Sequence, residues 1–360
     1  MPIPTLPGIT AKTITTARLT TRVLFFGQNN GIPVLFLHGN LISATCWEEV
    51  MLALAPGYRA IAPDQRGYGD ADPAKKIQPK PGMGLKDLAD DAVALLDHLA
   101  IGRAHIAGHS LGGSVIWQLL IDHPARFLTA TLIAPGSPYG FGGTKDVVGT
   151  PCYADFAGSG AGLIPPDMIK CIADGDRGLD NPFSPRTILR TLVVKPPFIP
   201  QREEELISAT LATHLGEQDF PGDSSPSSNW PYAAPGQWGP LNALSSKYAP
   251  DVNRLFSVTP PSHPKTPILW LRGSDDLMVS NNSPFDPATV GAQGLLPGWP
   301  GPDVYPPQPM LGQTRAVLEK YALSGGTYRE AVLEDAGHFP YLEQVTAFNE
   351  VFHRHISIQN

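Results

Sequence analysis

The chain has 360 residues, of which 42% are hydrophobic and 16% are charged, a balance that is typical of globular proteins and excludes a mostly disordered chain. Its net charge of -7 and the lack of any Lys/Arg run provide no basic surface for phosphate backbones, so we do not expect nucleic acid as a partner. No apolar stretch reaches the length of a membrane span and the first residues lack a signal-peptide pattern, so we expect a cytoplasmic protein.

Strands and helices are predicted to alternate along the first third of the chain. Paired strands are expected within residues 16–27, and short apolar runs predict further strands at 33–37, 58–62, 103–107 and 128–134. Apolar residues recur at helical spacing over 41–55, 85–99 and 110–123. This alternation predicts an α/β fold in which helices flank a mostly parallel sheet.

The alternation of strands and helices lapses from residue 135 to 267, where prolines and glycines surround helix candidates at 185–193 and 202–215. It resumes with strands at 268–271 and about 328–333, followed by a helix near 343–355. We therefore expect three parts, namely a core formed by 1–135 and 267–360, an inserted cap at 136–266, and an additional loop-rich insertion at 277–325.

A Gly-x-Ser-x-Gly pattern lies between a predicted strand and a predicted helix. It reads Gly108-His109-Ser110-Leu111-Gly112. The sharp strand-to-helix turn needs small residues two positions either side of the serine, whose hydroxyl then projects into a cleft. The helix N-terminus that follows favours negative charge developing at this point. The pattern in this setting predicts that Ser110 is a nucleophile.

A serine hydroxyl needs a base within hydrogen-bond reach and an acid that orients this base. His338 follows the last predicted strand, in a loop whose Gly337 permits a tight turn. By contrast, His353 and His355 lie late in the predicted terminal helix, where packing and surface roles are more common. His338 is therefore the predicted base.

The acid is expected at the carboxyl end of the strand predicted at 268–271, because this end of a parallel strand reaches the same edge of the sheet as the serine. Asp275 and Asp276 both stand there, whereas the strand at 128–134 ends without a carboxylate. The residue pattern leaves the choice between the two aspartates open.

The tetrahedral intermediate of acyl transfer also needs two N-H donors for its oxyanion. One is the backbone N-H of Leu111, at the start of the helix. The second is expected from the loop His38-Gly39-Asn40-Leu41, where the glycine permits close backbone approach. Asn40 N-H is the first choice for this donor and Leu41 N-H is the alternative.

Five ordered motifs give the chain a resemblance to the α/β-hydrolase superfamily. They are the His-Gly loop at 38–40, the segment 63–69, the turn around Ser110, the strand end at 273–276 and the loop 337–340. The resemblance implies an α/β-hydrolase fold with a serine nucleophile. In relatives the acid usually stands three residues after the glycine of the strand-end motif, and this spacing selects Asp276 over Asp275.

The His-Gly loop, with Ser43 and Trp47, is also similar to that of haloalkane dehalogenases and some epoxide hydrolases, which use an aspartate nucleophile. Because Ser110 stands at this position here, the resemblance implies acyl transfer through serine and not an alkyl-enzyme ester at a carboxylate. We interpret Asp64 and Arg66 as structural.

Both insertions leave the carboxyl edge of the predicted sheet, so we expect them to cover the cleft. Their apolar and aromatic content suits a bulky, weakly charged substrate. The candidate substrate-contacting residues are Leu41, His109, Met278, Trp299, Tyr305 and Phe339.

These features predict a serine hydrolase that cleaves a carboxylic ester or lactone of a fairly bulky apolar small molecule through an acyl-enzyme. A C-C bond hydrolase acting on a diketone and a perhydrolase are alternatives that use the same three residues, and a ligand receptor on this fold is an alternative of another class. No metal or cofactor motif is found, and Cys46, Cys152 and Cys171 match no metal spacing, so we expect neither a metal nor a cofactor.

Overall fold

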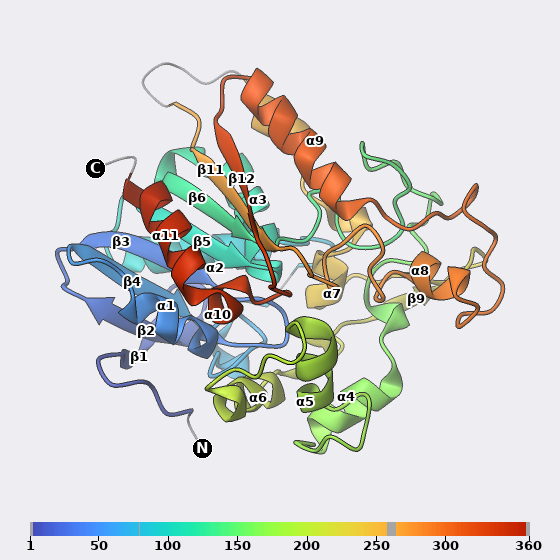
Figure 1. Ribbon diagram of the computed structural model, residues 1–360, viewed down its shortest axis with the longest axis horizontal. Helices are drawn as coiled ribbons and strands as arrows, with labels where there is room; N and C mark the ends of the chain where they lie inside the picture. The colour runs from blue at the N-terminus through green and yellow to red at the C-terminus, as the bar shows by residue number, and fades with distance from the viewer. Residues whose placement is uncertain (1–2, 79, 258–263, 358–360) are drawn as a thin grey trace.

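Eight strands form one sheet at the centre of the fold (Figure 1). The structure is a computed structural model that describes residues 3–78, 80–257 and 264–357. The strand order is β1-β2-β4-β3-β5-β6-β11-β12. β2 pairs antiparallel with β1 and β4, and every pair from β4 to β12 is parallel. The strands are β1 (Thr10–Thr15), β2 (Thr20–Gly27), β3 (Ile32–Leu37), β4 (Tyr58–Pro63), β5 (Ala104–His109), β6 (Phe127–Ile133), β11 (Ile268–Gly273) and β12 (Tyr328–Leu333).

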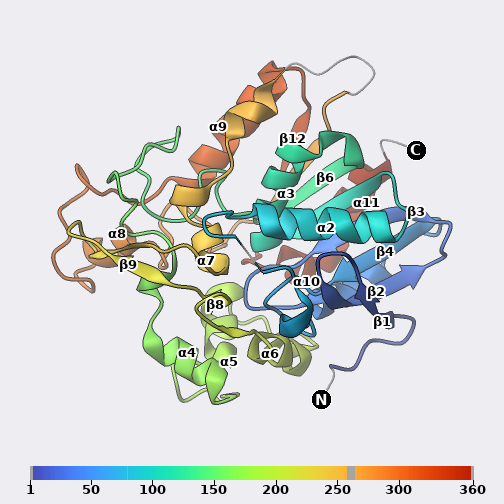
Figure 2. The same ribbon diagram turned by 180° about the vertical axis from the view of Figure 1, so that it is seen from behind.

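Helices cover both faces of the sheet and enclose two apolar cores. On the face that is in front in Figure 2, the helices are α2 (Lys86–His98) and α3 (Leu111–Asp122). The same core includes side chains of α9 (Met310–Leu323). On the opposite face lie the 3₁₀ helix η1 (Ala44–Trp47), α1 (Glu48–Leu52), α10 (Pro340–Glu343) and α11 (Val345–Ile356).

The central strand β3 shows why the parallel strands have continuous apolar sequences. Leu35 and Leu37 pack into the core beneath α2 and α3, whereas Val34 and Phe36 pack into the core on the other face. Successive side chains of a strand point to opposite faces, so a strand that is covered on both faces needs apolar residues at every position. The predicted α/β fold with a mostly parallel, helix-flanked sheet is confirmed.

Three boundaries differ from the prediction. The first of the two paired strands expected within 16–27 lies earlier in the sequence, since β1 ends before the turn at 16–19. Its residues are mainly exposed, so no apolar pattern indicates this strand. The helix expected at 41–55 is shorter, since Ser43 caps η1 and the residues before it form a loop. α9 lies inside the range 277–325 that was expected to be loop-rich, and its apolar side of Val317, Leu318 and Tyr321 packs on the main core.

The range 136–266 contains short elements. The helices α4, α5 and α6 lie together below and to the right of the sheet in Figure 1. Val252 and Leu255, near the end of the range, return to the core beneath α2 and α3. The elements are α4 (Pro166–Ala173), α5 (Pro185–Ile188), a π-helical turn (Leu189–Val193), α6 (Glu203–Leu211), β7 (Leu215–Gly216), β8 (Phe220–Pro221), β9 (Ser224–Pro226), β10 (Ala233–Pro235) and α7 (Pro240–Ala243).

A second irregular segment connects β11 to α9 and contains only one helix, α8 (Pro287–Ala292), among the described residues. Asp286 anchors this segment, because its buried carboxylate accepts the N-H of Ala288 at 3.0 Å and the N-H of Gln308 at 2.6 Å. Within the part of the chain that the structure describes, none of the helices combines the length and the apolar content needed to cross a membrane.

Candidate active site

Ser110 occupies a strained turn between β5 and α3. Its φ of 52° and ψ of -114° lie in a region that residues with a side chain rarely adopt. Glycines make the turn possible, since a Cβ at Gly108 would lie 2.4 Å from the carbonyl oxygen of Gly112, and a Cβ at Gly112 would lie 2.2 Å from that of Leu37. The geometry is the one expected from the sequence, and the side chain of Ser110 lines a cavity.

His338 and Asp276 form a buried pair across 62 positions of sequence. His338 Nδ1 lies 2.9 Å from Asp276 Oδ2, and the two side chains are only 4% and 3% exposed. The other carboxylate oxygen, Oδ1, accepts the N-H groups of Met278 at 2.8 Å and Val279 at 3.0 Å. A carboxylate held in this way keeps the imidazole proton on Nδ1, so that Nε2 is free to accept a proton.

The neighbouring Asp275 makes different contacts. Its side chain is exposed and its carboxylate pairs with Lys195 Nζ at 3.1 Å. Of the two aspartates that the residue pattern left open, Asp276 is the one in contact with His338.

His109, which precedes Ser110, contacts the loop that carries His338. Its Nε2-H donates to the carbonyl oxygen of His338 at 2.8 Å, and Tyr341 Oη lies 3.5 Å from its Nδ1. The two imidazole rings lie 4.6 Å apart. Burial, together with the nearby His338, holds the pKa of His109 well below its usual value, so the ring is neutral. His109 therefore connects the strand-to-helix turn to the loop of the proposed base.

The ring of His38 holds the His-Gly loop in place through two hydrogen bonds. His38 Nδ1-H donates to the carbonyl oxygen of Gly39 at 2.8 Å, and its Nε2 accepts the N-H of Gln65 at 2.9 Å. Burial lowers the pKa of His38 to about 4, which keeps the ring neutral. Because the peptide is planar and trans, the N-H of Asn40 points opposite to the Gly39 carbonyl, away from His38.

Gly39 brings this peptide close to the serine. A Cβ at Gly39 would lie 3.2 Å from the Cβ of Ser110 and 2.8 Å from His109 Nδ1. Asn40 lines the cavity together with Ser110, and Leu111 begins α3, where a backbone N-H has no partner within the helix. The N-H groups of Asn40 and Leu111 therefore remain the candidate donors for an oxyanion at Ser110.

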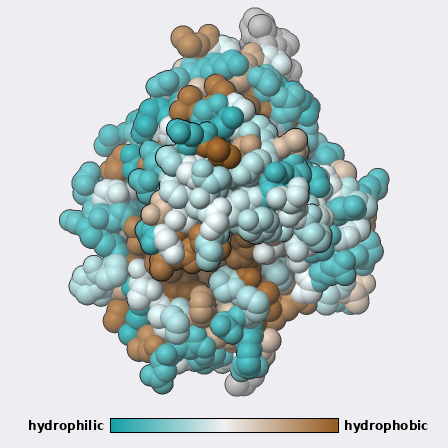
Figure 3. All heavy atoms as spheres, turned by 90° about the vertical axis from the view of Figure 1, so that its right-hand side faces the viewer, coloured by the Kyte–Doolittle hydropathy of each residue, from teal (hydrophilic) through white to brown (hydrophobic). Residues whose placement is uncertain are grey.

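The cavity that holds Ser110 and His338 has a volume of about 110 Å³ and mainly apolar walls. Figure 3 shows the face on the right-hand side of Figure 1, where hydrophobic residues gather around a hollow in its lower half. Most of the wall comes from α4 to α6 and from the segment after β11. The lining residues are Asn40, Leu41, Ile42, His109, Ser110, Met168, Ile172, Phe183, Pro185, Ile188, Leu189, Val193, Leu206, Thr210, Met278, Phe285, His338 and Phe339.

Four of the six candidate substrate-contacting residues line this cavity, namely Leu41, His109, Met278 and Phe339. Sequence reasoning missed the side chains from α4 to α6. The spacing of Met168 and Ile172 on one face of α4 is the signal that could have identified part of this wall, because residues four apart lie on the same side of a helix.

Trp299 and Tyr305, predicted as substrate-contacting residues, do not line the cavity and instead pack against each other. They form a separate apolar cluster with Trp230, whose ring lies 5.0 Å from that of Tyr305. Trp299 Nε1-H donates to the Tyr305 carbonyl oxygen at 2.9 Å, and the Tyr305 hydroxyl donates to the Ala157 carbonyl oxygen at 3.1 Å. A long irregular segment needs a small core of its own, and these aromatic residues provide it.

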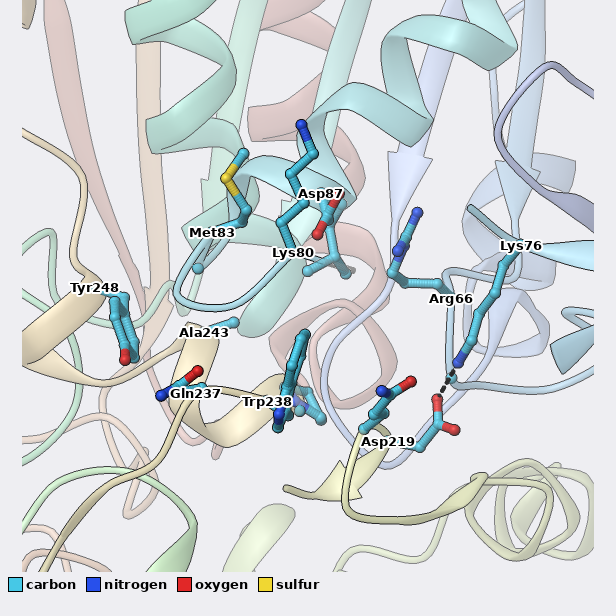
Figure 4. A pocket seen from close by; sticks show the side chains of 16 residues that line it. Arg66, Lys76, Lys80, Met83, Asp87, Asp219, Gln237, Trp238, Ala243 and Tyr248 are labelled. Carbon is cyan, nitrogen blue, oxygen red and sulfur yellow. Dashed lines mark hydrogen bonds and ion pairs between the residues drawn. The ribbon is translucent and has the colours of Figure 1, made fainter. Parts of the chain in front are cut away.

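A smaller hollow of about 50 Å³ lies elsewhere, between residues 66–88 and 218–248 (Figure 4). Lys76 Nζ donates to Asp219 Oδ1 at 2.7 Å across it, and Arg66 pairs with Asp91 through two hydrogen bonds. Since these charges neutralise each other and neither Ser110 nor His338 lines it, this hollow is not the candidate active site.

Within the described residues, no group of three or more His, Cys, Asp or Glu side chains is placed to hold a metal ion.

Comparison with known proteins agrees with the fold of the chain. Residues 32–149 match the family described as alpha/beta hydrolase fold. The chain is 38% identical over 116 residues to a non-heme chloroperoxidase of Streptomyces lividans, a match that covers 31% of this chain and 40% of that protein. It is 37% identical over 116 residues to epoxide hydrolase 2 of Siraitia grosvenorii, covering 32% and 35% of the two chains. The chain thus spans less than half the length of these curated relatives.

Among solved structures, the chain resembles 2-hydroxy-6-oxo-6-phenylhexa-2,4-dienoate hydrolase from Rhodococcus sp. strain RHA1. The TM-score is 0.57 at 17% identity, and the match covers 97% of this chain and 99% of that one. At this level of identity the likeness concerns the fold, which extends over nearly the whole chain.

Proposed function

We propose that this chain, whose residues 32–149 match the alpha/beta hydrolase fold family, is a serine hydrolase that cleaves a carboxylic ester or lactone of an apolar small molecule through an acyl-enzyme. One observation carries the proposal. Ser110 and His338 line the same cavity, and His338 Nδ1 lies 2.9 Å from Asp276 Oδ2, which leaves Nε2 to act as a base.

In the proposed reaction, His338 Nε2 accepts the hydroxyl proton of Ser110 as the oxygen attacks the substrate carbonyl. The backbone N-H groups of Leu111 and Asn40 donate to the oxyanion. His338 then passes its proton to the leaving alcohol, and Asp276 stabilises the imidazolium in between. Water, deprotonated by the same imidazole, hydrolyses the ester formed on Ser110.

The walls of the cavity favour an uncharged, apolar substrate. No Asp, Glu, Lys or Arg side chain lines the cavity among the described residues. A charged substrate group would therefore lose its hydration without gaining a partner of opposite charge, whereas each buried methylene contributes about 0.8 kcal/mol. Residues between the start of α4 and the end of α6 supply most of the apolar lining side chains, namely Met168, Ile172, Phe183, Pro185, Ile188, Leu189, Val193 and Leu206.

Hydrolysis of p-nitrophenyl butanoate by the purified protein tests the proposal. We expect multiple turnovers by the unaltered protein and a loss of roughly a thousandfold or more in kcat for Ser110→Ala and for His338→Ala, with an unchanged melting temperature for Ser110→Ala. Ser357→Ala alters an exposed serine and serves as the matched control. Turnover by Ser110→Ala at the rate of the control would exclude the mechanism, and ligand binding without turnover would favour the receptor alternative.

A further inference from the structure

Few polar side chains are available to orient a substrate in the cavity. Apart from Ser110 and His338, only three of the described lining residues have polar side chains, namely Asn40, His109 and Thr210. In a mainly apolar pocket, a small number of placed polar groups decides which substrates are accepted and how they are oriented. The hydrogen bonds that these three side chains already make within the protein therefore determine which of them can still donate a hydrogen bond to a substrate.

Two of the three have no donor left. His109 Nε2-H donates to the carbonyl oxygen of His338, and its Nδ1 faces the hydroxyl of Tyr341. The Thr210 hydroxyl donates its only proton within the protein, with the Leu41 carbonyl oxygen at 2.8 Å as its nearer acceptor. A substrate acceptor can obtain no hydrogen bond from either side chain.

Asn40 differs, because only its oxygen is engaged. The Tyr68 hydroxyl donates to Asn40 Oδ1 at 2.6 Å. Tyr68 is 1% exposed, and its burial raises its pKa well above the usual value, so it is a neutral phenol that must donate its proton. Its ring also packs edge-on against His38 at 5.3 Å. The orientation of the Asn40 amide is thereby fixed, with Oδ1 toward Tyr68 and Nδ2 away from it.

The Nδ2 group of Asn40 has no hydrogen-bond partner among the described residues, on a side chain that lines the cavity. This Nδ2 group belongs to the same residue, Asn40, whose backbone N-H we propose as a donor to the oxyanion. We therefore expect an acceptor that reaches Nδ2 to belong to the acyl group, near the scissile carbonyl. A neutral amide suits a neutral oxygen, and no lining cation is present to neutralise a carboxylate.

We propose that Asn40 Nδ2 is the specificity-determining donor of the cavity, and that it selects acyl groups with a neutral ether, hydroxyl or keto oxygen next to the scissile carbonyl. This inference rests on the proposed serine-hydrolase function. Tyr68 acts as a positioning residue, because it orients the amide without reaching the substrate.

Two esters of equal shape test this selection. In p-nitrophenyl methoxyacetate an ether oxygen replaces a methylene group of p-nitrophenyl butanoate. The kcat/KM for each ester is divided by the rate of hydroxide-catalysed hydrolysis of the same ester, which removes the difference in their intrinsic reactivity. We expect the unaltered protein to prefer the methoxyacetate by roughly fivefold to tenfold, the effect of one hydrogen bond. Asn40→Leu keeps the backbone N-H and should reduce this normalised preference to about one.

Asn40→Leu leaves the Tyr68 hydroxyl unpaired, so the double variant Asn40→Leu/Tyr68→Phe, which removes both partners, is measured beside it. Both variants should lose the preference to the same extent, while Tyr68→Phe alone keeps the donor and should retain part of it. Labelling of Ser110 by a fluorophosphonate in each variant shows that the reactive site is still formed.

An unchanged normalised preference in both Asn40 variants overturns the proposal, and so does equal hydrolysis of the two esters by the unaltered protein. A loss that affects both esters equally would also overturn it, because Asn40 would then act on the oxyanion alone. Each of these results leaves the serine mechanism intact. Failure of the proposed function is a different result, in which the unaltered protein hydrolyses neither ester and Ser110 is not labelled.

Discussion

The replacement Asp276→Asn changes the protonation of His338 without changing the shape of the site. In the native site, Oδ1 of Asp276 accepts the N-H groups of Met278 and Val279, and Oδ2 lies 2.9 Å from His338 Nδ1. In the variant, one of these two oxygen positions is taken by an NH2 group. An NH2 turned toward the backbone would leave two N-H donors without an acceptor, at a cost of about 1–3 kcal/mol for each buried group.

The NH2 of the variant is therefore expected to face His338 and to donate to Nδ1. The imidazole proton must then reside on Nε2, which can no longer accept the proton of Ser110. In the Ser-His-Asp triad this wrong tautomer lowers kcat by roughly ten-thousandfold, which corresponds to about 5.5 kcal/mol of transition-state stabilisation. Because both backbone hydrogen bonds persist, the free energy of unfolding should change by no more than about 1 kcal/mol.

Steady-state hydrolysis of p-nitrophenyl butanoate and thermal unfolding measure the two effects. Asp275→Asn is the matched control, since this neighbouring carboxylate is exposed and pairs with Lys195. Its kcat should stay within about twofold of the unaltered protein, because an exposed ion pair contributes little. Equal losses in the two variants, or full activity of Asp276→Asn, would refute the assignment of the acid and the reasoning about the tautomer.

Three further predictions follow from single residues. His109→Phe should lower kcat roughly tenfold with little change in KM, and His109→Gln, whose amide can donate to the His338 carbonyl, should restore most of it in the same assay. Gly39→Ala should also lower kcat, measured beside its melting temperature, because the new Cβ would lie 3.2 Å from the Cβ of Ser110. Burial raises the pKa of Asp286 to about 6, above the unfolded value of about 3.9, so its contribution to stability is fully present below pH ~4 and is lost as the pH rises through about 6. Urea unfolding at several pH values should show a smaller decrease over this window in Asp286→Asn than in the unaltered protein.

The sequence could predict those site residues whose positions are determined by their immediate neighbours in the chain. The glycines around Ser110 and the apolar runs beside them specify a strand, a sharp turn and a helix within a few residues. His338 likewise lies in the short loop that follows β12. The choice between Asp275 and Asp276 could not come from the residue pattern, because both follow the same strand and only the contact with His338 distinguishes them.

Features that depend on long-range packing were harder to predict. β1 has mainly exposed residues and is an edge strand held by its pairing with β2, so it carries no apolar signal. Trp299 and Tyr305 are aromatic residues in a segment expected to cover the cleft, but their packing against Trp230 places them in a separate cluster. Composition alone cannot distinguish an aromatic side chain that lines a cavity from one that stabilises a loop.

The most direct test of the serine mechanism is the identification of the residue that carries the acyl group. The protein is mixed with p-nitrophenyl butanoate, quenched in acid within the first turnover, and digested for mass spectrometry of its peptides. We predict one butanoyl group, located on Ser110, which is absent from Ser110→Ala and present in the control Ser357→Ala. A butanoyl group on another residue, or hydrolysis by Ser110→Ala at an undiminished rate, would contradict the assignment of Ser110 as the nucleophile.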